Sequence, residues 1–365
     1  MKKLSFRSLA CTFFATVTLA AIFSAFTACN PSAESKTPKA NKLSIVTTIY
    51  PEFAWTKEIL GNLADSNNLS LLIKNGVDLH SYKPSAQDIA KIASADMVVY
   101  VGGESDEWIE DALKATPKKG RTEISLMKVL GSRVKPEEIV EGMQGETKDE
   151  RRETREDAKE DHEHAETHES DEHAEDHDHH HHDGEVENDE HVWLSLKNAE
   201  ILVKKIAEGL AKIDSVHASS YEQNATAYVA KIKELDSEYS TAIEKAARKT
   251  VLFGDRFPFR YLVDDYGIKY YAAFVGCSAE SEASFETIAF LAGKMDSDSL
   301  PAIFTIEKGN KKIASAVLTT SKSSKNAAIL TLNSMQSVTE QQIAEGIDYL
   351  TIMRSNLDVL KKALN

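Results

Sequence analysis

The sequence predicts an α/β protein of two lobes, each with a mainly parallel sheet, joined by one long rigid helix. Short runs of β-branched and apolar residues alternate with amphipathic stretches in both halves of the 365-residue chain, a pattern typical of βα units. Between the halves, residues 219–248 contain no Gly or Pro, which predicts a single unkinked helix. At about 1.5 Å per residue, such a helix is long enough to cross between two domains.

The N-terminus has the composition of a bacterial signal peptide. Three basic residues precede an apolar run over residues 9–26, and the small residues that follow end at Cys29. A Cys in this position resembles the lipobox of bacterial lipoproteins. We therefore expect residues 1–29 to be a lipoprotein signal peptide, Cys29 to be the site of lipid attachment, and the polar residues 30–41 to be a tether. A signal peptide cut elsewhere, or a retained membrane anchor, is the alternative.

The first lobe is expected to span residues 42–218. Three short apolar runs predict buried strands, at residues 43–50, 69–74 and 97–102. Ser85 followed three residues later by Asp88 is a capping box, which predicts that a helix begins between the second and third strands. His80 therefore lies on a strand-to-helix loop, at the edge where open α/β sheets bind their ligands.

The same alternation resumes in residues 249–365, which we assign to the second lobe. Apolar and aromatic runs predict four strands, at residues 251–254, 268–274, 302–307 and 328–332. Amphipathic stretches between them predict helices, and a last helix is expected from Thr339 to Leu364.

The acidity of the chain is concentrated in one segment. The net charge is -15, but residues 137–190 contain 24 of the 58 acidic residues and only 5 of the 43 basic ones. The rest of the chain therefore has a slight excess of bases. No basic cluster with interleaved aromatic residues occurs in the sequence, which argues against nucleic acid as a ligand.

The acidic segment is also rich in histidine. It holds nine of the 12 histidines in its central part: His162, His164, His168, His173, His177, His179, His180, His181 and His182. Imidazole and carboxylate are the ligands that borderline divalent metals such as zinc prefer. With almost no apolar residues to bury, residues 140–190 are expected to form a solvated loop that gathers metal. An acidic linker is the alternative.

Four segments together resemble the solute-binding proteins of ABC transporters for zinc and manganese. They are IVTTIYP, GVDLHSYKPSAQDIAKIASAD, DEHVWLSLKNA and the terminal DYLTIMRSNLDVLKKAL. The similarity extends from about residue 42 to residue 365, and the loop resembles the His-rich insertion of zinc-specific members. The resemblance implies two lobes, a rigid linking helix, a metal ion in the cleft between the lobes, and delivery of that ion to a membrane permease.

The resemblance also implies metal ligands from the first lobe. His80 matches the first ligand of the family, and His191, in the segment HVWL, matches the second. Zinc binds neutral imidazole nitrogen and prefers four ligands in a tetrahedron. Of the remaining candidates, His217 is expected to be an exposed surface residue. Cys277 could bind zinc in principle, but a lone thiol among small residues is more typical of a buried apolar position.

The resemblance identifies the ligands from the second lobe less directly. The third ligand position of the family aligns with Arg256, whose guanidinium stays protonated and cannot bind a metal. We therefore expect Asp255 to take its place, although a helix N-cap is an equally good interpretation of Asp255. The fourth position corresponds to Glu307 or Asn310, and Glu280 lies in a further loop that resembles a cleft loop of the family.

Together these features predict an extracytoplasmic, membrane-anchored and monomeric protein that captures Zn²⁺ and delivers it to an ABC permease. Mn²⁺ is the alternative cargo, but hard Mn²⁺ gains little from clusters of imidazole, so the histidine-rich loop favours zinc. A surface zinc buffer or adhesin that acts without a permease is the alternative function. No HExxH motif of zinc hydrolases occurs in the sequence, and we expect no enzymatic activity.

Overall fold

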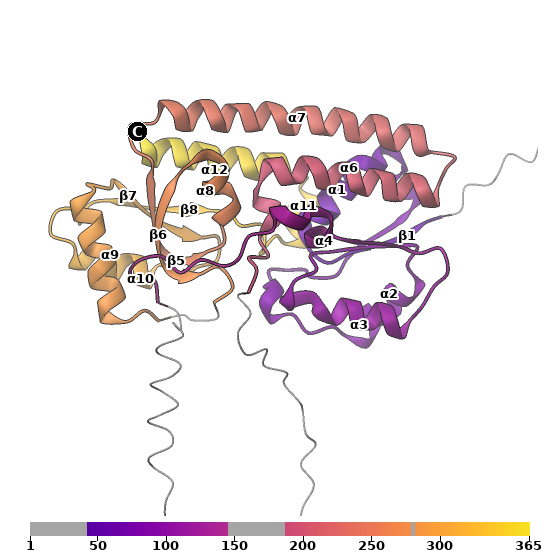
Figure 1. Ribbon diagram of the computed structural model, residues 1–365, viewed down its shortest axis with the longest axis horizontal. Helices are drawn as coiled ribbons and strands as arrows, with labels where there is room; N and C mark the ends of the chain where they lie inside the picture. Colours follow the sequence, from indigo (N-terminus) through magenta and orange to yellow (C-terminus); the bar gives the residue numbers. More distant parts are fainter. Residues whose placement is uncertain (1–41, 145–186, 279–281) are drawn as a thin grey trace, which may run out of the picture. The chain divides into compact units, whose positions relative to one another are not determined.

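A computed structural model describes residues 42–144, 187–278 and 282–365, which form two lobes (Figure 1). Each lobe is built on a four-stranded sheet in which all neighbouring strands are parallel. The strand order is β2-β1-β3-β4 in the first lobe and β6-β5-β7-β8 in the second. The predicted fold class, two α/β lobes with parallel sheets, is confirmed.

Strands and helices alternate along the first lobe. Its strands are β1 (Ser44–Thr47), β2 (Asn68–Leu71), β3 (Met97–Tyr100) and β4 (Thr122–Ser125). Its helices are α1 (Tyr50–Leu60), α2 (Ala86–Ser94), α3 (Glu107–Ala115) and α4 (Leu126–Leu130), with short 3₁₀ turns η1 (Gly61–Ser66), η2 (Leu79–Ser81), η3 (Glu104–Asp106) and η4 (Gly131–Arg133). Because the strands are parallel, the loops that follow them meet at one edge of the sheet.

Side-chain caps fix where the first helices begin. The buried carboxylate of Glu52 accepts hydrogen bonds from the backbone N of Thr48 at 2.8 Å and of Ile49 at 3.2 Å, so it caps the N-terminus of α1. Ser85 and Asp88 form the predicted capping box of α2. The Ser85 Oγ accepts from Asp88 N at 3.3 Å, and Asp88 Oδ2 accepts from Ser85 N at 3.0 Å.

Figure 1 shows α7 (Ala218–Lys245) along the top of the view, and α6 (Leu196–Ile213) and α12 (Tyr349–Leu364) each pack beside it. Helix α7 has 28 residues and is the predicted linking helix. A continuous buried core joins side chains of both lobes through these helices, including Val98, Leu202, Tyr239, Phe253 and Leu357. Within the described residues, no helix has the length and apolar character needed to span a bilayer.

The second lobe repeats the alternation of the first. Its strands are β5 (Thr250–Phe257), β6 (Lys269–Val275), β7 (Ala302–Ile306) and β8 (Ala328–Leu332). Its helices, before α12, are α8 (Arg260–Tyr266), α9 (Phe285–Ser297), α10 (Lys312–Thr320) and α11 (Glu340–Ala344).

The last helix is shorter than the sequence predicted. In place of one helix from Thr339 to Leu364, the chain forms α11 and then α12, and the break lies at Gly346. Gly346 has a φ of +89°, a left-handed conformation that ends the helical hydrogen-bonding pattern. The side chain of Asp348 then accepts from Thr351 N at 2.9 Å and caps the new helix.

The chain crosses to the second lobe at the start of the acidic segment, so the solvated loop expected for residues 140–190 does not begin before residue 145. Lys135 N donates to the Tyr261 hydroxyl at 3.0 Å, and Gln144 N donates to the Ala273 carbonyl in β6 at 2.8 Å. Residues 135–144, grouped with the first lobe on sequence grounds, therefore lie against the sheet of the second lobe.

Strand β5 and helix α10 are in close contact at Gly254, and a substitution there tests this packing in the second lobe. A Cβ at Gly254 would lie 2.6 Å from the Cα of Ala314 and 2.8 Å from its backbone N, so Gly254→Ala must displace backbone atoms. We expect the free energy of unfolding to fall by about 1–3 kcal/mol, measured by urea denaturation.

The control is Gly293→Ala in α9, where no heavy atom lies within 4 Å of the added Cβ. Alanine is a better helix former than glycine, so this variant is expected to be unchanged or up to about 1 kcal/mol more stable. Equal unfolding midpoints for the two variants would contradict the packing of β5 on α10.

Candidate metal centre

Two histidines of the first lobe face each other through their Nε2 atoms, 3.3 Å apart. His80 lies on the 3₁₀ turn η2 after β2, and His191, fully buried, directly precedes the turn η5 (Val192–Leu194). With zinc–nitrogen bonds of 2.0–2.1 Å, two nitrogens of a tetrahedral site lie about 3.3–3.4 Å apart. The two Nε2 atoms therefore already have the spacing of zinc ligands.

The Nδ1 atom of each ring has a hydrogen-bond partner on the side away from the other histidine. His191 Nδ1 lies 2.9 Å from Asp189 Oδ1, and His80 Nδ1 lies 2.5 Å from Ser105 Oγ on η3. A carboxylate only accepts hydrogen bonds, so Nδ1 of His191 carries a hydrogen and its Nε2 is the metal-binding nitrogen. A second partner of this kind is what orients an imidazole that binds a metal.

The two rings have opposite affinities for protons. Burial lowers the pKa of His80 to about 3, with a further contribution from the charge of His191. Burial also acts to lower the pKa of His191, but the charge and hydrogen bond of Asp189 outweigh it, and the pKa is raised above its ordinary value. A proton bound by the pair is therefore held by His191, which donates it in a hydrogen bond to His80 Nε2. A cation that binds between the rings must displace this proton.

Buried carboxylates surround the histidine pair. Glu190 Oε1 accepts from Ser105 N at 2.8 Å. Its other oxygen, Oε2, is buried, accepts no hydrogen bond from the described residues, and lies 3.7 Å from His80 Nδ1. Burial raises the pKa of Glu190. Together with Asp189, this residue makes the site attractive to a cation and costly to leave without one.

The second lobe places a thiol beside the pair. Cys277 follows β6, and its Sγ and one nitrogen from each of His80 and His191 lie within 4.8 Å of one another. Cys277 N donates to Glu137 Oε1 at 3.1 Å. Burial and the charge of Glu137 raise the pKa of the Cys277 thiol, so it keeps its proton until a metal takes its place. Sequence reasoning considered Cys277 as a ligand but favoured a buried apolar role, although the residue follows a strand at the same kind of sheet edge as His80.

Glycine permits the approach of the Cys277 loop to His191. A Cβ on Gly276 would lie 3.0 Å from Cε1 and 3.1 Å from Nδ1 of His191, and also 3.0 Å from the carbonyl oxygen of Phe257. Any larger residue would therefore move either the loop or the ring. The contact ties the position of Cys277 to that of His191.

The expected ligand Asp255 is engaged elsewhere. Its Oδ2 accepts from Ile306 N at 3.1 Å, and its Oδ1 accepts from Arg256 N at 2.9 Å. The side chain of Arg256 forms an ion pair with Asp78, the N-cap of η2, so the residue at the family's third ligand position joins the two lobes. The structure does not bring Asp255 into the group with the two histidines.

The expected ligand Glu307 also holds the second lobe together. Its two oxygens accept from Ser334 N at 2.7 Å, from Ser334 Oγ at 2.9 Å and from Gln336 N at 3.1 Å. Asn310 Oδ1 accepts from Lys312 N at 3.2 Å, near the start of α10. Neither residue joins the histidine–thiol group within the described part of the chain.

Other sequence-based candidates lie away from the centre or outside the described residues. His217 is half-buried rather than exposed, and its Nδ1 lies 2.6 Å from Asp214 Oδ2 at the start of α7. Cys29, Glu280 and the nine histidines of the acidic segment lie outside the described residues.

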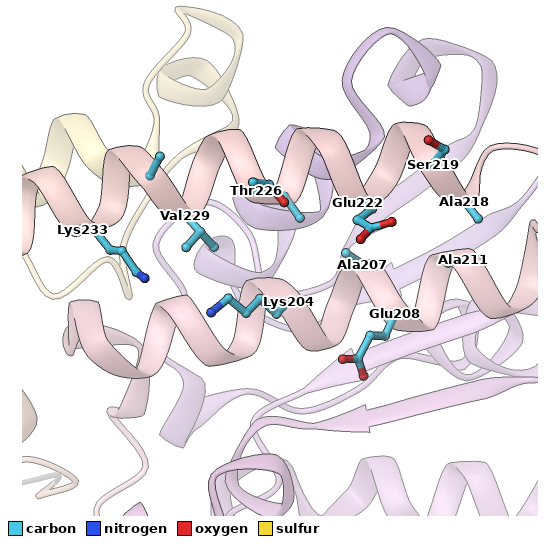
Figure 2. A pocket seen from close by; sticks show the side chains of 12 residues that line it. Lys204, Ala207, Glu208, Ala211, Ala218, Ser219, Glu222, Thr226, Val229 and Lys233 are labelled. Atoms are coloured by element: carbon cyan, nitrogen blue, oxygen red, sulfur yellow. The ribbon is translucent and has the colours of Figure 1, made fainter.

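A hollow of about 720 Å³ lies between α6 and α7 and is separate from this centre (Figure 2). Small side chains line it, among them Ala207, Ala211, Ala218 and Ala225, and charged residues stand at its edges, such as Lys204 and Glu208. By contrast, the cavity next to the centre, lined in part by Asp189 and Gly276, measures about 10 Å³. A space of that size holds at most a single water molecule.

Comparison with known proteins agrees with this chemistry. The family model for "zinc-uptake complex component A periplasmic", ZnuA, matches residues 45–363. The high-affinity zinc uptake system protein ZnuA of Bacillus subtilis is 31% identical over 348 residues, which cover 95% of this chain and 96% of that protein. The zinc-binding lipoprotein AdcA of Streptococcus pneumoniae is 30% identical over 323 residues, 88% of this chain but 56% of the relative. This chain thus spans little more than half the length of its streptococcal relatives.

Solved structures share the fold. The Zn(II)-bound ZnuA-like domain of Streptococcus pneumoniae AdcA superposes with a TM-score of 0.63 at 27% identity, covering 89% of this chain and 99% of that domain. The metal-dependent lipoprotein YcdH of Bacillus subtilis gives a TM-score of 0.65 at 27% identity, covering 89% of this chain and 100% of the other. With its two parallel-sheet lobes, its histidine pair and a family match over nearly its whole length, the chain belongs to the ZnuA family of zinc-uptake components.

Proposed function

We propose that the protein is the extracytoplasmic binding component of an ABC transporter, which captures Zn²⁺ at His80 and His191 and delivers it to a membrane permease. The pair of Nε2 atoms at 3.3 Å carries the proposal, because buried nitrogens that face each other need either a proton or a cation between them. The second partners of both rings, Ser105 and Asp189, hold that geometry before any metal arrives.

The cellular location is inferred from the relatives and from the N-terminal sequence. One relative is named a lipoprotein, and the family description is periplasmic. We infer that Cys29 carries a lipid that anchors the protein, as a monomer, to the outer face of the cell membrane. The relatives named above are zinc-binding and zinc-uptake proteins rather than enzymes.

The first test removes one imidazole at a time. His80→Ala and His191→Ala should each weaken the tightest zinc site at least tenfold, about 1.4 kcal/mol, because each removes a nitrogen ligand. Competition titration against a zinc chelator measures this. His217→Ala is the matched control, since His217, which precedes α7, pairs with Asp214 at the end of α6 and not with the centre. An unchanged zinc affinity in either of the first two variants would contradict the assignment.

The second test is the dependence on pH. The metal-free pair keeps a proton because the pKa of His191 is raised, whereas the zinc-bound rings are both deprotonated. Zinc affinity should therefore fall more steeply with decreasing pH once the pH drops through the raised pKa of His191, which lies above 6.5. The proton on His191 should add a fall that approaches tenfold per pH unit in chelator competition. An affinity that stays level from pH 8 to about pH 5 would contradict this mechanism.

The third test separates the centre from the acidic segment. We propose that the nine histidines from His162 to His182 bind additional zinc weakly, because the segment combines imidazole with carboxylate and has almost no apolar residues. Deleting residues 150–188 should lower the number of zinc ions bound per chain and leave one tight site, as measured by calorimetry. Loss of the tight site in the deletion variant would show that the segment, and not the centre, holds the transported ion.

A further inference from the structure

We propose that Cys277 supplies the second lobe's ligand to the transported zinc ion, so that the metal joins the two lobes through two imidazoles and one thiolate. The inference rests on the proposed function and names the residue that completes its site. The Sγ–H bond is broken as the Zn–S bond forms, and the proton passes to water.

The first support for this inference is the distance from the Cys277 sulfur to the two imidazoles. Sγ of Cys277 lies within 4.8 Å of a nitrogen of both His80 and His191. In a tetrahedral zinc site, nitrogen and sulfur ligands lie about 3.6 Å apart, given bonds of 2.0–2.1 Å and 2.3 Å. The nitrogens already have their final spacing, so a shift of about 1 Å in the loop after β6 would complete three of the four positions.

The loop is built to hold the thiol in this place. Gly276 lets the backbone approach the ring of His191, and Glu137 holds the amide of Cys277 at 3.1 Å. Arg256 NH1 donates to the carbonyl of Ser278 at 3.4 Å, while the same guanidinium pairs with Asp78 of the first lobe. The residues on both sides of Cys277 are thus fixed to the elements that carry the two histidines.

A second observation points to a cation at this position. Glu190 Oε2 is buried beside His80 and accepts no hydrogen bond from the described residues, so its negative charge has no donor to balance it. A zinc ion between the histidines and the thiol supplies the positive charge that balances the carboxylate of Glu190. The other carboxylates proposed for the second lobe already have hydrogen-bond donors. Both oxygens of Asp255 accept from backbone amides. The two oxygens of Glu307 accept from two backbone amides and one hydroxyl.

A thiolate ligand also determines which metal is selected. Thiolate is a soft ligand that favours Zn²⁺ strongly over the hard ion Mn²⁺, whereas carboxylate ligands suit Mn²⁺. A centre with two imidazoles and a thiolate therefore excludes manganese more strongly than one completed by Asp255 and Glu307 would.

The experiment uses Co²⁺ as a spectroscopic substitute for zinc in the full-length chain with Cys11→Ser and Cys29→Ser, so that Cys277 is the only thiol. The protein is kept in detergent with a phosphine reductant. One equivalent of Co²⁺ should produce the intense near-ultraviolet charge-transfer band of a thiolate–cobalt bond, and one equivalent of Zn²⁺ should abolish it. The histidine-rich segment cannot give this band because it contains no cysteine.

Matched variants assign the band. Cys277→Ser should abolish it, whereas Asp255→Asn and Glu307→Gln should keep it, with thermal unfolding confirming that each variant is folded. In chelator competition, Cys277→Ser should also reduce the ratio of zinc to manganese affinity at least tenfold.

Two outcomes separate the inference from the proposed function. Tight zinc binding that depends on His80 and His191, without a thiolate band, would overturn the role of Cys277 and leave the function standing. Absence of any tight zinc site in the chain that retains Cys277 would overturn both.

Discussion

The fully buried ring of His191 is the constraint on which the rest of the centre depends. Its segment is clamped by the second lobe, since the Tyr261 hydroxyl donates to the Asp189 carbonyl at 2.8 Å and Trp193 Nε1 donates to the Ser334 carbonyl at 2.9 Å. Asp189 orients the ring from one side, and His80 faces it from the other. A buried imidazole fixed at so many points cannot turn away to find water, so its free nitrogen must be matched by a proton or a metal.

The same contacts limit how far the lobes can separate. Helix α7 runs its 28 residues without a residue that would kink it, and one apolar core continues from the first sheet to the second. Opening the molecule about a hinge would break this core and the hydrogen bonds to Trp193. Loading and release of an ion therefore require local movement of the η2 turn with His80 and of the loop with Cys277, rather than a large rotation of the lobes.

The sequence was sufficient for the fold class and for the two histidines that the structure brings together. Periodicity, the Ser85 capping box and the long stretch without Gly or Pro predicted parallel lobes and a linking helix, because these signals are local. His80 and His191 came from motifs that span many residues. The second lobe's half of the centre could not be predicted, because it depends on which loops meet. Alignment by position led to Arg256 and Asp255, and nothing local reveals that Gly276 lets the next strand's loop reach His191.

The register of the second sheet explains how Arg256 and Cys277 come to lie at the same edge. Strands β5 and β6 are parallel neighbours, with Arg256 opposite Phe274, so the residues that follow both strands reach the same edge. A side chain two residues beyond β6 can therefore replace one at the end of β5 as a ligand. The positive charge left at the end of β5 would repel a cation, but Arg256 is paired with Asp78, which removes most of that repulsion. The ion pair thus joins the lobes, and the position beside it stays suitable for a divalent metal.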